Sequence, residues 1–235
     1  VSASGLGRGK LDVGAYEKEE IHLNEVDAEG RRRWGEVFAT DHLNEAIVRL
    51  YERYAECLPE GPARTRATTT AQALAAIVLA LGPEAWATAL TPDAEQIDHR
   101  QLGTWNARGR DAIVAHIGSL SAVADNVTLL TREILAAEPG AVLFRRIHAG
   151  TERRGGGAYE RLLLLLLTFA TDGRVARVEF FDDTDEATAC ARFDALTGRT
   201  EARPPRPVER RVRVNAARTM RVRIDAAIAA GDPDA

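Results

Sequence analysis

Three consecutive residues, Asp98, His99 and Arg100, place a carboxylate, an imidazole and a guanidinium side by side. A histidine can act as a general base, because its unperturbed pKa of about 6.5 lies near neutrality. A complete acid–base site also needs an oxyanion donor or a second acid, and no motif in the sequence supplies one. His99 is therefore the candidate catalytic base, and the alternative is a hydrogen-bonded histidine that lines a pocket.

Aromatic residues could supply the apolar part of such a pocket. Trp86 and Trp105 either close a pocket mouth or pack in the core, because aromatic side chains bury large areas. Tyr159 recurs as Tyr16 in a similar segment, which indicates a shared structural place and not a special reaction.

The remaining titratable residues give no pattern of a metal or cofactor site. His116 and His148 are far apart and have no ligand spacing to cysteine or to another histidine. The acidic run 182–186 could bind a cation, but acidic residues are also favoured at a helix N-terminus, and this second interpretation is preferred. There is no glycine-rich phosphate loop with a Walker-type lysine. We expect no metal and no cofactor.

Composition excludes several classes of protein. The chain has 235 residues, of which 45% are apolar and 28% charged, so it can bury a core. A net charge of -4 gives no general attraction to nucleic acid. The longest apolar run, Leu162–Ala170, is about half of the roughly 20 residues needed to cross a bilayer. Two cysteines, Cys57 and Cys190, fit a reducing compartment, so the sequence predicts a cytoplasmic protein with no membrane or nucleic-acid partner.

An internal repeat organises the chain. A shift of 143 residues places Gly14 on Gly157 and aligns two segments without a gap. Both segments read as a strand, a glycine turn, a second strand and a helix. The ten identical pairs are Gly14/Gly157, Ala15/Ala158, Tyr16/Tyr159, Glu17/Glu160, Gly30/Gly173, Arg31/Arg174, Glu36/Glu179, Phe38/Phe181, Ala46/Ala189 and Arg49/Arg192.

The repeat predicts four parts. Residues 1–57 are expected to be the hairpin and helix that end a preceding unit, and residues 62–197 a complete unit. Residues 198–214, rich in proline and arginine, read as a linker. Residues 215–235 contain a weaker copy of the helix near Ala75 and are expected to open a following unit. The chain thus resembles a window cut from a tandem array.

Six consecutive leucines, Leu162–Leu167, stand where a half-exposed strand should alternate apolar with polar residues. A strand that loses this alternation is buried on both faces. We expect one face to cover the helices and the other to meet a homodimer partner or a neighbouring tandem unit. In the first copy, Glu19, Glu20 and His22 should be more exposed.

The order of elements predicts an α+β fold, with helices first and a curved antiparallel sheet afterwards. Two segments carry a family resemblance: IDHRQLGTWNARGRDAIVAHIGSL from Ile97, and GAYERLLLLLLTFATDGRVARVEFFDDTDEATACARF from Gly157. They resemble the nuclear transport factor 2-like superfamily, in particular its SnoaL-like branch. The resemblance implies a cone-shaped sheet with packed helices, and a pocket between the two.

The same resemblance implies where chemistry would lie. His99 falls where the steroid isomerases of this superfamily carry a general-base carboxylate, and Asp98 matches its acidic neighbour. The fold hosts isomerases, cyclases and epoxide hydrolases as well as binding modules. Tandem copies look like those at the C-terminal end of large bacterial regulatory ATPases and cyclase-domain proteins.

Two functions follow as expectations. In the first, the unit is a small-molecule-binding or protein-interaction module of a larger bacterial regulatory protein, and it holds an apolar ligand. In the second, it is an isomerase, polyketide-type cyclase or epoxide hydrolase that uses His99 as general base. The residues expected to contact the ligand are Asp98, His99, Arg100, Trp105 and Tyr159.

Overall fold

The structure is a computed structural model that describes residues 2–5, 16–80 and 82–200. Val1–Arg199 make up one compact unit, and the description below concerns this unit. Nearly all of the predicted linker 198–214 and the whole of the predicted helix in 215–235 lie outside the described residues.

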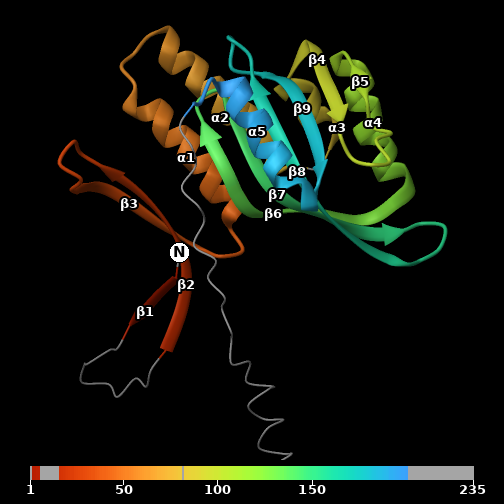
Figure 1. Ribbon diagram of the computed structural model, residues 1–235, viewed down its shortest axis with the longest axis horizontal. Coiled ribbons are helices and arrows are strands. Elements are labelled where there is room, and N and C mark those ends of the chain that lie inside the picture. Colours follow the sequence, from red (N-terminus) through yellow and green to blue (C-terminus); the bar gives the residue numbers. More distant parts are fainter. Residues whose placement is uncertain (1, 6–15, 81, 201–235) are drawn as a thin grey trace, which may run out of the picture. The chain divides into compact units, whose positions relative to one another are not determined.

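The predicted α+β class is confirmed (Figure 1). The helices are α1 (Leu43–Cys57), α2 (Pro62–Val78), α3 (Pro83–Ala89), α4 (Arg110–Val123) and α5 (Glu186–Thr197), with a 3-10 turn η1 (Asp183–Asp185) before α5. The strands are β1 (Ser2–Gly5), β2 (Tyr16–Val26), β3 (Arg32–Ala39), β4 (Leu90–Asp98), β5 (Ala107–Arg108), β6 (Ala124–Glu138), β7 (Ala141–Glu152), β8 (Ala158–Phe169) and β9 (Val175–Asp182).

The larger sheet has the strand order β5-β4-β9-β8-β7-β6. Strands β6 to β9 form an antiparallel meander, and β4 joins it in parallel beside β9. The β6–β7 register shifts at three places, and such bulges bend a strand and increase its twist. The sheet is curved as a result. A smaller sheet of order β1-β2-β3 precedes α1.

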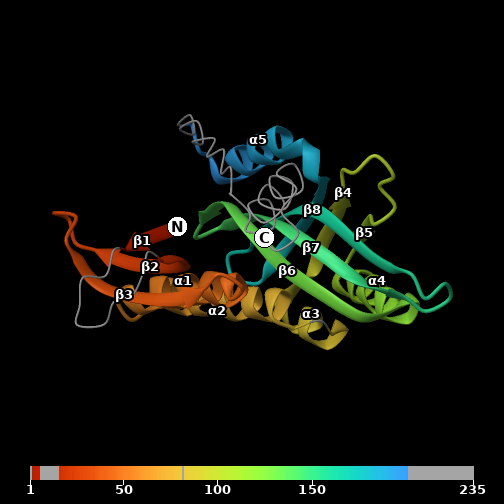
Figure 2. The same cartoon turned by 90° about the horizontal axis from the view of Figure 1, so that it is seen from below.

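Helices cover both faces of the larger sheet (Figure 2). Helices α2, α3 and α4 pack on one face together with α1, and α5 packs on the other. Proline at the first helical position starts α2 at Pro62 and α3 at Pro83. Gly198, with φ of 70°, ends α5 in the left-handed conformation that glycine tolerates best.

Five of the six leucines in the run, Leu163–Leu167, alternate between two separate cores, and Leu162 is 40% exposed. The odd-numbered members from Leu163 on belong to the main core beneath α1 to α4. Leu164 and Leu166 are 0% exposed and pack against Phe193 of α5. The prediction that a second copy or a tandem unit covers this face is therefore wrong for these two residues, because η1 turns the chain back and α5 covers the face itself.

The two repeated segments have matching local structures. When the first segment is shifted by 143 residues, the bounds of β3 coincide with those of β9. The first residues of α1 and α5 are equivalent under the same shift. An ion pair from strand to helix recurs: Arg49 Nε lies 3.0 Å from Glu36 in the first segment, and Arg192 Nε lies 3.1 Å from Glu179 in the second. As predicted, Glu20 and His22 are more exposed than their equivalents Leu163 and Leu165, but the prediction is wrong for Glu19, because its equivalent Leu162 is 40% exposed.

Candidate functional site

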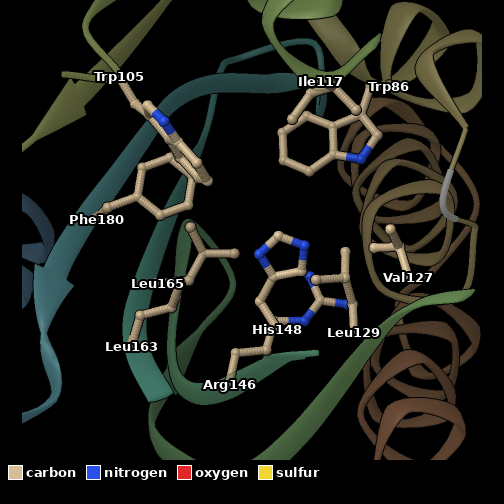
Figure 3. A pocket seen from close by; sticks show the side chains of 10 residues that line it. All are labelled: Trp86, Trp105, Ile117, Val127, Leu129, Arg146, His148, Leu163, Leu165 and Phe180. Atoms are coloured by element: carbon tan, nitrogen blue, oxygen red, sulfur yellow. The ribbon is translucent and has the colours of Figure 1, made fainter. Parts of the chain in front are cut away.

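An apolar cavity lies between α3, α4 and the face of the sheet that carries Leu163 and Leu165 (Figure 3). About 50 Å³ is open to the centre of a water-sized sphere, which is room for a small ligand or several waters. Its lining residues are Trp86, Trp105, Ile117, Val127, Leu129, Arg146, His148, Leu163, Leu165 and Phe180.

The sheet contributes these side chains through its two-residue period. Arg146 and His148 are two apart on β7 and point to the same face, and they stand opposite Leu163 and Arg161 of β8. The ring of His148 points into the space that Trp105 and the other aromatic residues surround (Figure 3). In the lining of the cavity, β7 therefore contributes polar side chains, and the neighbouring strands β6 and β8 contribute apolar ones.

Arg146 is a buried cation in this otherwise apolar lining. Only 2% of the residue is exposed. Its guanidinium donates to the carbonyl oxygens of Ile77 and Val78 at distances of 3.1–3.4 Å, and its Nε has no hydrogen-bond partner. Burial lowers the pKa of Arg146 to about 10, so the side chain remains charged at neutral pH.

His148 is paired with Tyr159 on the neighbouring strand. The Tyr159 hydroxyl lies 3.3 Å from His148 Nε2, and the two rings meet edge to face. Gly150 makes this possible, because a Cβ there would lie 2.8 Å from the tyrosine hydroxyl oxygen. Burial, with the nearby charges of Arg161, Arg146 and Arg100, lowers the pKa of His148 below its ordinary value of 6.5. The imidazole is therefore neutral at pH 7.

A second, more polar cavity adjoins the other side of His148. About 410 Å³ of it is open to the centre of a water-sized sphere. Arg153, Arg154 and Arg161 line it with the carboxylate of Glu152, and Asp125 pairs with Arg153 at 2.9 Å, so the cavity keeps a small excess of positive charge. Tyr159, one of the residues expected to contact the ligand, lines this outer cavity and not the inner one.

Trp105 lines the inner cavity, and Asp98 and Arg100 lie directly behind it. Arg100 stacks over the Trp105 ring at 4.6 Å and makes two hydrogen bonds of 2.8 Å to the Asp98 carboxylate. Burial opposes ionisation of Asp98, but the hydrogen bonds from Arg100 and from the Trp105 backbone N–H outweigh it and lower its pKa. The ion pair therefore fixes Trp105 in place.

His99 does not line the cavity, so its expected orientation is corrected. Its ring stacks on Phe181 at 4.4 Å, and its Nε2 lies 2.7 Å from Glu179 Oε2. Glu179 also accepts hydrogen bonds from Arg192 of α5. Successive residues of a strand point to opposite faces, so His99 lies beneath α5 while Asp98 lies on the cavity side.

Arg146 and His148 were not predicted to line a pocket. The available signal was the segment from Ala141 to Ala149, where charged and imidazole side chains interrupt an apolar strand two residues apart. Within residues 2–5, 16–80 and 82–200, no group of three or more His, Cys, Asp and Glu side chains could hold a metal ion. In the same part of the chain, no helix is both long and apolar enough to cross a membrane.

Comparison with known proteins shows similarity to solved structures alone. No family model matches the sequence, and no curated protein matches it. A nuclear transport factor 2-like protein from Burkholderia thailandensis is 22% identical over 56% of this chain and 98% of its own, with a TM-score of 0.42. An epoxide hydrolase of the LEH-like type from M. tuberculosis is 18% identical over 56% and 97%, with a TM-score of 0.40.

A third similar structure is a protein with a ketosteroid isomerase-like fold from Catenulispora acidiphila, in complex with trimethylamine. It is 19% identical over 47% of this chain and 82% of its own, with a TM-score of 0.40. Identities this low do not transfer chemistry between proteins that share a fold. The nature of the site has to follow from its own residues.

Proposed function

We propose that the inner cavity binds a small, mostly apolar molecule. The observation that supports this best is the lining: eight of its ten side chains are apolar, and the other two are Arg146 and His148. Ligand sites of this kind combine apolar walls with a few polar groups that fix the orientation of the ligand. The Asp98–Arg100 pair, which holds Trp105, gives the wall a fixed shape before any ligand arrives.

The finer proposal is that the chain is a ligand-binding or protein-interaction module of a larger bacterial regulatory protein. The internal repeat supports it, because a hairpin, a helix and an ion pair between them occur twice in one chain. Copies that diverge while keeping a structural ion pair are typical of modules strung in tandem.

A catalytic alternative rests on His148 in place of His99. A neutral imidazole that points into a cavity and contacts a tyrosine hydroxyl is a group that can accept a proton. Isomerase, cyclase or epoxide-opening chemistry would use this pair. Product formation by the wild-type protein that is lost in a His148→Ala variant would favour this alternative over binding alone.

Filling the cavity tests the binding proposal. Val127 lies half-buried in the lining, and a Val127→Trp variant would place an indole in the space that the ligand needs. We expect this variant to bind cyclohexanecarboxamide or isobutyramide about tenfold more weakly or worse, as measured by NMR titration. Leu130→Trp is the matched control, because Leu130 is 42% exposed and is absent from the lining. Equal affinity in both variants, or no binding to the wild type, would refute the proposal.

A further inference from the structure

Arg146 differs from three other arginines on or beside the larger sheet, each of which has an acidic partner. Arg145 contacts Asp183 and Glu186, Arg177 contacts Glu95, and Arg192 contacts Glu179. Arg146 is more buried than these, yet in the described part of the chain its guanidinium contacts the carbonyl oxygens of Ile77 and Val78 and the Phe144 ring, and no carboxylate. A buried charge without a counter-charge is costly, so a site that keeps one indicates an anionic partner.

A second unsatisfied donor lies beside Arg146. Thr131 of β6 stands directly opposite Arg146 of β7, so the two side chains share one face of the sheet. The Thr131 hydroxyl is buried and, like Arg146 Nε, has no hydrogen-bond partner. Buried polar atoms in native structures are nearly always satisfied. Of the two residues, Arg146 alone lines the cavity, so its free Nε points to an acceptor supplied from outside the chain.

A purely structural role explains part of this arrangement. Ile77 and Val78 are the last residues of α2, where helix carbonyls lack partners, and a cation there is favoured by the helix dipole. Arg146 satisfies these carbonyls through its two terminal nitrogens. That role leaves both Nε and the Thr131 hydroxyl unexplained.

We propose that the ligand of the inner cavity is a small carboxylic acid, whose apolar part contacts the aromatic walls and whose carboxylate is bound by Arg146, the buried cation of the lining. The inference rests on the proposed function, since it names the class of ligand for the same cavity. The outer cavity suits this class, because Arg154 and Arg161 would attract an anion toward His148 and the inner cavity.

Matched pairs of ligands separate the contribution of the carboxylate to the affinity from that of the apolar part. Isobutyrate, cyclohexanecarboxylate and phenylacetate are titrated against their primary amides by calorimetry or NMR. We expect the wild type to prefer each acid by about tenfold to a hundredfold, the range for a hydrogen bond to a charged group. Arg146→Met, which keeps length and removes charge, should abolish the preference and retain amide binding. Arg132→Met removes an exposed charge next to Thr131 and should leave the preference unchanged.

A measurement on the wild type covers the case in which Arg146→Met does not fold. The Arg146 Nε–H resonance should move downfield when an acid is added and should not move with the amide, because the free donor gains a charged acceptor. An unmoved resonance overturns the inference, as does a preference abolished by Arg161→Met and not by Arg146→Met. Amides that bind as well as acids refute the inference alone, whereas failure of both classes to bind refutes the proposed function with it.

Discussion

Replacing Phe193 with alanine lowers the free energy of unfolding by about 3–5 kcal/mol, the usual cost of removing a buried phenylalanine. Phe193 of α5 is 0% exposed and packs with Leu164 and Leu166 of β8. It is the main apolar residue that α5 contributes to this second core, so its loss leaves a cavity that the small neighbour Ala189 cannot fill. Urea denaturation followed by circular dichroism measures the change.

The matched control for Phe193 lies on the same helix. Leu196 is 37% exposed, and Leu196→Ala should change stability by well under half as much. Sedimentation of both variants should give the mass of the wild type. A small loss of stability in Phe193→Ala, accompanied by a change in mass, would mean that another copy of the chain covers this face and that α5 does not.

Replacing Glu179 with alanine is expected to cost about 3 kcal/mol, at the lower end of the range for breaking a buried ion pair. Its side chain is 0% exposed, and Arg192 and His99 both donate hydrogen bonds to it. Truncation leaves these two donors facing an apolar space under α5. The lower end of the range applies because Arg192 and His99 are themselves about one-third exposed and can turn toward water.

The internal repeat supplies the control for Glu179. Glu36 occupies the equivalent position, but 40% of its side chain is exposed, so Glu36→Ala should cost no more than about 1 kcal/mol. Burial opposes ionisation of Glu179, and the hydrogen bonds from Arg192 and His99 outweigh it and lower its pKa below 4.5. Its contribution is therefore complete above pH 4.5 and declines as the pH falls through the folded-state pKa. Equal losses for the two variants at neutral pH would contradict the buried-network interpretation.

The sequence predicted the fold well where patterns were local. The alternation lost in Leu162–Leu167 correctly indicated a strand buried on both faces. What covered the second face was not predictable from that strand, because the answer depends on the turn at Asp183–Asp185 and on where α5 then packs. The equivalent helix α1 has a similar start but contributes Ile47 and Tyr51 to the main core instead.

Some of the expected site residues lie at the cavity and His99 does not, because neighbouring residues of a strand face opposite sides of the sheet. Trp105 lies in the lining of the cavity, and Asp98 and Arg100 lie immediately behind it. His99 was placed on the wrong face, because a one-residue error in orientation moves a strand residue to the opposite side of the sheet. The interruption of the apolar strand at Arg146 was visible in the sequence, but the unpartnered Nε depends on neighbours distant in sequence and is shown only by the structure.

The leucine run provides the most direct test of the cavity as the ligand site. Intermolecular nuclear Overhauser effects are measured between cyclohexanecarboxylate and the methyl groups of β8 in the wild-type protein. We expect contacts to Leu163 and Leu165, which line the cavity, and to the Trp105 indole. We expect none to Leu164 and Leu166, which lie under α5. Contacts to Leu164 and Leu166, or contacts confined to residues outside the lining, would contradict ligand binding in the cavity.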